Sequence, residues 1–180
     1  RASTMFLDRN ADLAAWMKRS DVIAHETAHM WFGDYVTMKW FDDVWTKEVF
    51  ANYFASRIVE PLYPDVNHRL NFIRDYIPAS YSEDRTSGAN PIKQDLDNLR
   101  NAGLVYGNII YDKSPVIMEM LVRVLGEDAF QQGIREYLTT YAYGNATWEG
   151  LIRILNKYTE EDLAAWSEVW VNQKCMPEIT

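Results

Sequence analysis

Apolar residues recur every three or four positions along most of the chain, and this spacing predicts helices. The clearest case is a helix from Asp43 to Glu60, ended by Pro61, with these apolar residues at helical spacing: Val44, Trp45, Val49, Phe50, Phe54 and Ile58. Alternating strand patterns are few. We therefore expect a mainly α fold with little or no strand.

Two helices are expected before this one. The first is a short helix over Arg9–Arg19. Ser20 is a favourable N-cap for the second, which would run from Asp21 to about Phe32. Gly33 would stop it, because glycine is common just beyond a helix C-terminus. The two helices around residues 21–60 can pack antiparallel.

The remainder of the chain also reads as helix, apart from a polar loop over Ser80–Asn98. Ser114 is expected to cap a helix that has Pro115 at its first position, and Thr147 and Thr159 to cap two later ones. A stray strand is possible near Ala2–Leu7 or Tyr35–Met38. The expected helices are Asp65–Ile77, Ser114 to about Gly126, Glu127 to about Tyr141, 148–157 and 160–172.

The second helix carries a His-Glu-x-x-His motif at residues 25–29. His25 and His29 lie four residues apart, hence on one helical face, where two imidazoles can bind one zinc ion. Glu26 could act as general base toward a metal-bound water. Eighteen residues separate His29 from Glu48, whose carboxylate would complete a His/His/Glu ligand set with one open position.

These residues carry a resemblance. His-Glu-x-x-His, eighteen residues, then Glu resembles the gluzincin metallopeptidases, and the flanks at 24–48 together with Tyr111-Asp112-Lys113 resemble the aminopeptidase N-like family. The resemblance covers roughly residues 15–177. It implies one zinc ion per chain, and a single domain, 1–180, that is the helical lobe of a thermolysin-like catalytic domain. The parent enzyme's remaining domains would then be partners absent from this chain.

The resemblance also gives roles to residues that spacing alone leaves open. Asp34, Asp42 and Asp43 are nearer competitors for the third ligand position, but only Glu48 fits the family spacing. Tyr111 opens the family's Tyr-x-Lys-Gly pattern, whose tyrosine assists the tetrahedral intermediate. Tyr106 is a weaker second choice.

Three departures from the family pattern stand out. Val49 and Ser114 occupy positions where the family usually has glycine. The family's Gly-x-Met-Glu-Asn motif, which holds the substrate's free amino group, does not occur in the chain, and Met118-Glu119-Met120 is no substitute because it lies downstream.

The expected function is zinc-dependent aminopeptidase action on peptides. An epoxide-hydrolysing relative and a catalytically silent zinc-binding fragment are the alternatives.

A functional role is less strongly indicated for the other side chains. Asn52 follows Glu48 by one helical turn and could support a ligand. His68 is expected at the surface and Cys175 as a small buried side chain. The aromatic residues near the motif are expected in the core: Trp31, Phe32, Trp40, Trp45 and Phe50.

The bulk composition narrows the possible partners. With 180 residues, 48% of them hydrophobic, the chain suits one globular domain. Its net charge of −8 disfavours nucleic acid and anionic membranes. No apolar run is long enough to span a membrane. A single cysteine leaves both cytoplasmic and exported locations open.

Overall fold

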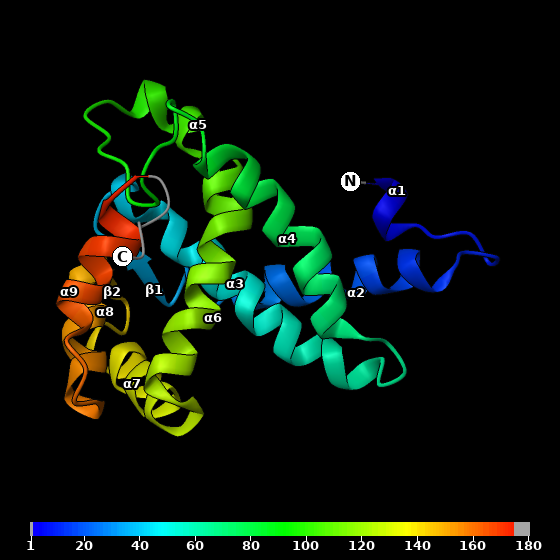
Figure 1. The fold of residues 1–180 in the computed structure, drawn as a ribbon. Coiled ribbons are helices and arrows are strands. Elements are labelled where there is room, and N and C mark those ends of the chain that lie inside the picture. The colour runs from blue at the N-terminus through cyan, green and yellow to red at the C-terminus, as the bar shows by residue number, and fades with distance from the viewer. Residues whose placement is uncertain (1, 175–180) are drawn as a thin grey trace.

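Helices make up most of the structure, a computed structural model that describes residues 2–174 (Figure 1). The α-helices are α1 (Ala2–Met5), α2 (Leu13–Ala28), α3 (Val44–Val59), α4 (His68–Asp84), α5 (Ala102–Val105), α6 (Ser114–Leu125), α7 (Glu127–Thr140), α8 (Trp148–Leu155) and α9 (Leu163–Ser167). Short 3-10 turns lie at Phe41–Asp43, Glu60–Leu62, Leu99–Asn101 and Asn156–Tyr158, and π turns at Ile109–Lys113 and Glu168–Asn172. The prediction of a mainly α fold is confirmed. Cys175, expected to be a small buried side chain, lies outside the described residues.

The long helices α2 and α3 pack against each other, and α2 extends from α3 toward the N-terminal side of the molecule (Figure 1). The two helices expected on either side of Ser20 are in fact one, α2, which Asp12 caps by accepting a 2.8 Å hydrogen bond from the Ala15 amide. Ser20 lies inside that helix, and its hydroxyl is 2.8 Å from the Tyr63 hydroxyl. Because Asp12 already caps the helix upstream of Ser20, one long helix forms in place of two short ones.

A two-stranded parallel sheet joins distant parts of the chain. Strand β1 (Val36–Met38) pairs with β2 (Gly144–Ala146), with Thr37 opposite Asn145. The strand expected within Tyr35–Met38 is therefore present, but Ala2–Leu7 contains a helical turn in place of a strand. Strand β2 has no alternating pattern of its own, and tertiary pairing alone places it.

Helix α4 is longer than its sequence pattern indicates. It continues through Pro78 to Asp84, into the segment expected to be a loop. Helix α6 follows directly on the π turn Ile109–Lys113, so Ser114 is not an N-cap, and its buried hydroxyl donates to the Ile110 carbonyl oxygen. At the end of α4, Asp84 is buried against Lys113, a contact across 29 residues that local sequence rules do not include.

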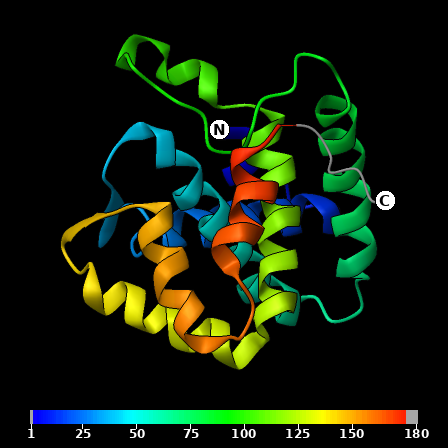
Figure 2. The same cartoon turned by 60° about the vertical axis from the view of Figure 1, so that its left-hand side comes forward.

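Helices α7, α8 and α9 succeed one another along one side of the molecule, each packed on the next (Figure 2). Thr147 caps α8 as expected, accepting from the Gly150 amide at 3.1 Å. Asp162, rather than Thr159, caps α9. None of the helices within residues 2–174 has the length and apolar character needed to cross a membrane.

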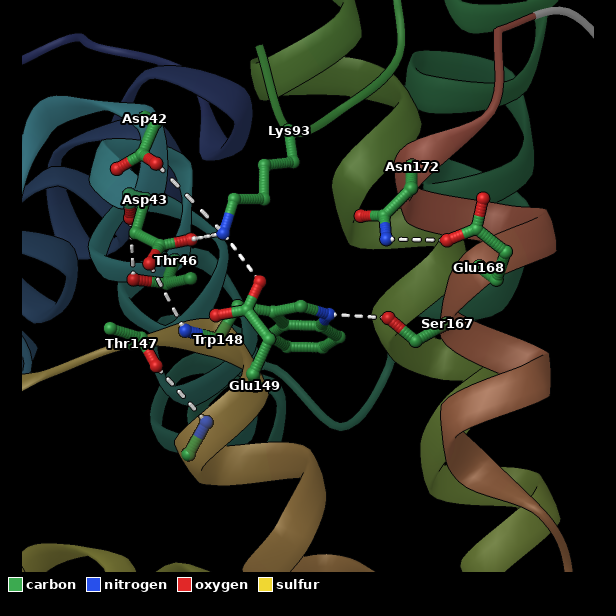
Figure 3. Close-up of polar contacts among 11 residues, drawn as sticks. Asp42, Asp43, Thr46, Lys93, Thr147, Trp148, Glu149, Ser167, Glu168 and Asn172 are labelled. Atoms are coloured by element: carbon green, nitrogen blue, oxygen red, sulfur yellow. Dashed lines mark hydrogen bonds and ion pairs between the residues drawn. The ribbon is translucent and has the colours of Figure 1, made fainter. Parts of the chain in front are cut away.

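A polar cluster centred on Lys93 fastens the loop before α5 to the core (Figure 3). The Lys93 ammonium lies 3.2 Å from an Asp43 carboxylate oxygen and 2.5 Å from Glu149. Burial raises the pKa of Asp43, while Lys93 opposes that rise. The other Asp43 oxygen accepts from the Trp148 amide at 3.2 Å, and Trp148 also donates its indole N–H to Ser167 at 2.7 Å. The N-terminus of α3 is thereby tied to α8 and α9.

Candidate metal centre

Two histidines of α2 and one glutamate of α3 converge at the meeting point of these helices. The Nε2 atoms of His25 and His29 are 3.0 Å apart, and they lie 3.4 and 3.7 Å from the same oxygen, Oε2, of Glu48. Among the described residues these three form the group whose potential ligand atoms lie within 4.8 Å of one another. Because α2 and α3 run antiparallel, a residue near the start of α3 returns to the end of α2, as expected.

Both imidazoles are oriented by contacts at their other nitrogen. Nδ1 of His25 is 2.9 Å from Oδ1 of Asn52, and Nδ1 of His29 is 3.0 Å from the Phe32 carbonyl oxygen. These oxygens accept hydrogen bonds, so each Nδ1 carries a proton, and each Nε2 lies on the side of its ring that faces Glu48. Metal-binding histidines are commonly held in this way. The contact expected for Asn52 is present.

Glu48 is well suited to remain ionised. Burial by itself raises the pKa of its carboxyl group, but hydrogen bonding with His25 and His29 and the charge of Lys47 lower it more, and the pKa falls well below the usual range. The pKa of His29 is raised, chiefly by its hydrogen bond with Glu48, with burial acting in the opposite direction. An anionic oxygen next to two imidazole nitrogens is a donor set that suits a divalent zinc ion.

The three residues open onto a cleft of about 1140 Å³ whose lining comes from α1, α2, α3, the 3-10 turn after α3, α4 and the π turn before α6. Glu26 is exposed and lines this cleft, as does Tyr111, whose exposed fraction is 39%. The ring of Tyr106 stacks on that of Tyr111 at 6.2 Å between centroids, but Tyr106 is not among the cleft-lining residues. The structure therefore brings the predicted catalytic pair to one cavity with the predicted ligands.

The competing acidic residues lie elsewhere. Asp43 is buried in the Lys93 cluster, and neither Asp34 nor Asp42 belongs to the group around Glu48. His68 is half-buried rather than a surface residue, because its Nε2 donates to the Tyr63 carbonyl oxygen at 2.8 Å.

The aromatic residues near the motif divide into two groups. Phe32, Trp45 and Phe50 are buried, as expected. Trp31 and Trp40 are exposed, contrary to expectation. Trp31 follows the end of α2, where the chain turns, and Trp40, although exposed, donates its indole N–H to the Leu96 carbonyl oxygen at 2.7 Å.

Helix α4 supplies a cleft wall that the motifs do not indicate. Phe72 and Tyr76 both line the cleft, with ring centroids 4.9 Å apart. Burial, together with the nearby carboxylates of Asp21, Asp112 and Asp75, raises the pKa of Tyr76 to about 12, so this phenol stays protonated. Their spacing of four residues is the one signal in the sequence that places them on a common face.

Comparisons with known proteins found a matching family and several similar sequences. The model of the peptidase family M1 domain matches residues 1–170. The chain is 30% identical over its whole length to probable aminopeptidase 1 of Sulfurisphaera tokodaii, covering 23% of that protein. Over 87% of its length it is 34% identical to the puromycin-sensitive aminopeptidase of Caenorhabditis elegans, covering 16% of it, and over 88% it is 33% identical to aminopeptidase N of Streptomyces lividans, covering 19%. The chain thus spans less than a quarter of the length of these relatives.

Proposed function

Because the chain belongs to peptidase family M1, we propose that it is the zinc-bearing helical part of the catalytic domain of a longer aminopeptidase. The parent enzyme would release N-terminal residues from peptides. One observation carries this proposal: His25, His29 and Glu48 converge beside a cleft that Glu26 and Tyr111 also line. The names of the relatives, all aminopeptidases, support the same reaction class.

The donor set fits zinc. His25 and His29 would each bind through Nε2 and Glu48 through a carboxylate oxygen, while Asn52 and the Phe32 carbonyl keep the imidazoles oriented. Three protein ligands and one open position are typical of catalytic zinc sites. When bound, zinc lowers the pKa of water and polarises a carbonyl group.

The remaining steps of the proposed reaction are carried out by two residues of the chain. The Glu26 carboxylate, exposed in the cleft, takes the proton of the attacking water and later delivers it to the departing amine. The Tyr111 phenol donates a hydrogen bond to the carbonyl oxygen as negative charge builds on it, and stabilises the transition state. The groups that grip the substrate's free amino terminus belong to the rest of the parent polypeptide.

Metal analysis and activity of the parent polypeptide test the proposal together. His29→Ala should lose most of its zinc and its turnover of an aminoacyl chromogenic substrate, because one of three protein ligands is gone. His68→Ala is a matched control, since His68 lines the same cleft but contacts a backbone carbonyl. Undiminished zinc in His29→Ala would contradict the ligand assignment. Hydrolysis of an epoxide without peptide hydrolysis, or neither reaction in zinc-loaded parent, would contradict the aminopeptidase assignment.

A further inference from the structure

A buried ion pair joins the end of α4 to the start of α6. The Lys113 ammonium donates to Oδ1 of Asp84 at 2.8 Å, across 29 residues of sequence, and the two residues are 6% and 4% exposed. Neither lines the cleft. Removing two charges from water is costly, and a buried pair is weak evidence of a gain in stability. The reaction steps proposed above use neither group, so the pair needs another explanation.

The position of Lys113 in the chain gives the first part of an explanation for the pair. It is the last residue of the π turn Ile109–Lys113, which also carries Tyr111, and π turns are rare segments that occur frequently at functional sites. Ile109 and Ile110 are buried just before Tyr111, and Lys113 is buried two residues after it. The turn is therefore anchored on both sides of the one tyrosine that it presents to the cleft.

The position of Asp84 gives the second part of the explanation. It is the last residue of α4, the helix whose Phe72 and Tyr76 line the same cleft, and α4 packs along the π turn. An apolar contact would allow the turn to slide along the helix. A charged hydrogen bond is directional and fixes one distance between its partners. The pair thus holds the base of the turn in a set position relative to the cleft wall.

We propose that Lys113 and Asp84 are positioning residues, and that their ion pair sets the direction in which the π turn aims the Tyr111 phenol into the cleft. This inference rests on the proposed function of Tyr111. A group that must meet developing charge on one oxygen loses its effect when it is displaced by about an ångström. The pair therefore acts on turnover through Tyr111 and has no contact with the substrate.

A double-mutant cycle in the parent polypeptide tests the inference. Lys113→Met should lower kcat about 10- to 100-fold, as the loss of supporting contacts commonly does. The KM value and the zinc content should hardly change, because the interaction is confined to the transition state. In a Tyr111→Phe background the same substitution should have little further effect, since the group that it positions is already gone.

Two further variants make the test decisive. The neutral pair Asp84→Asn with Lys113→Met leaves no uncompensated buried charge, so it serves if Lys113→Met does not fold. It should show the same dependence on Tyr111. Lys93→Met is the matched control: it breaks another largely buried lysine cluster, away from the cleft, and any loss it causes should add to that of Tyr111→Phe.

The outcomes separate the inference from the proposed function. Additive losses for the Lys113 and Tyr111 substitutions, or an unchanged kcat in the folded neutral pair, would overturn the positioning role while leaving Tyr111 as a catalytic residue. An unchanged kcat in Tyr111→Phe itself would remove the role of Tyr111 and the positioning role together.

Discussion

Asn52 Oδ1 lies 2.9 Å from Nδ1 of His25 and links α3 to the histidine pair of α2 at a second point beside Glu48. This contact directs Nε2 of His25 toward the Glu48 carboxylate and fixes the tautomer that a metal requires. Helix α3 thus carries one candidate ligand and, one helical turn later, the residue that orients another.

Asn52→Ala should weaken zinc binding by about 10- to 100-fold without abolishing it, because the ligands remain but one of them is no longer oriented. Competition with a chelator, measured on the parent polypeptide, gives the affinity. Asn71→Ala is a suitable control, since Asn71 is a cleft-lining amide on α4 outside the ligand group. Equal zinc affinity in parent and Asn52→Ala would show that the contact does not support binding.

Glu26→Gln should keep zinc and lose about 10² to 10⁴ in turnover, because the amide preserves the shape of the side chain but cannot accept the proton of water. Glu60→Gln, another cleft-lining glutamate, controls for the loss of negative charge in the cleft. Steady-state turnover of an aminoacyl chromogenic substrate measures the effect. If Glu26→Gln stays within a few-fold of the parent, another group is the base.

Tyr111→Phe should lower kcat by about 10² to 10³ and change KM less, because its hydrogen bond forms to an oxygen that becomes negative only toward the transition state. Tyr106→Phe is the control, since Tyr106 stacks on the same ring without lining the cleft. Kinetics of both variants of the parent decide between a catalytic phenol and one that only packs. An equal, small change in both variants would favour packing.

The chain expressed as residues 1–180 should show little or no aminopeptidase activity when loaded with zinc. The proposed ligands and Glu26 are present, but groups that orient the substrate's amino terminus are expected outside it, and orientation is a large share of catalysis. Several large apolar side chains of α2 and the turn after it are exposed, which favours self-association: Leu13, Trp16, Ile23, Met30 and Trp31.

Assay of the purified chain beside the parent polypeptide, with sedimentation to measure its association state, checks both parts of this expectation. A comparable kcat/KM for the two proteins would show that the cleft is complete within these residues. A monomer at high concentration would show that the exposed side of α2 does not drive self-association.

Much of the secondary structure follows from local rules. Helix α3 lies within the range that its apolar spacing predicts, and Thr147 caps α8 because a side-chain oxygen three residues before a free amide needs no distant partner. The spacing of His25 and His29 likewise places both on one helical face, whatever the rest of the fold. These features depend on neighbours within a turn or two along the chain.

Features that depend on distant partners were not predictable in the same way. Helix α4 runs past Pro78 and ends at Asp84, which is buried against Lys113, and β2 exists only because β1 lies beside it. The two helices expected on either side of Ser20 merge into α2, in which Asp12 is the cap and the Ser20 hydroxyl instead meets the distant Tyr63 hydroxyl.

The candidate site likewise has features that depend on local sequence and features that depend on tertiary contacts. The sequence by itself determined the candidate ligand pair His25 and His29, since a helical repeat brings them together, and the resemblance to a family named Glu48 and Tyr111 as further candidates. Only the tertiary structure decided that Glu48 meets the histidines, that Asn52 orients one of them, and that a buried Lys113–Asp84 pair anchors the turn bearing Tyr111. The reason is physical: these contacts join separate helices, and their geometry follows from how the helices pack.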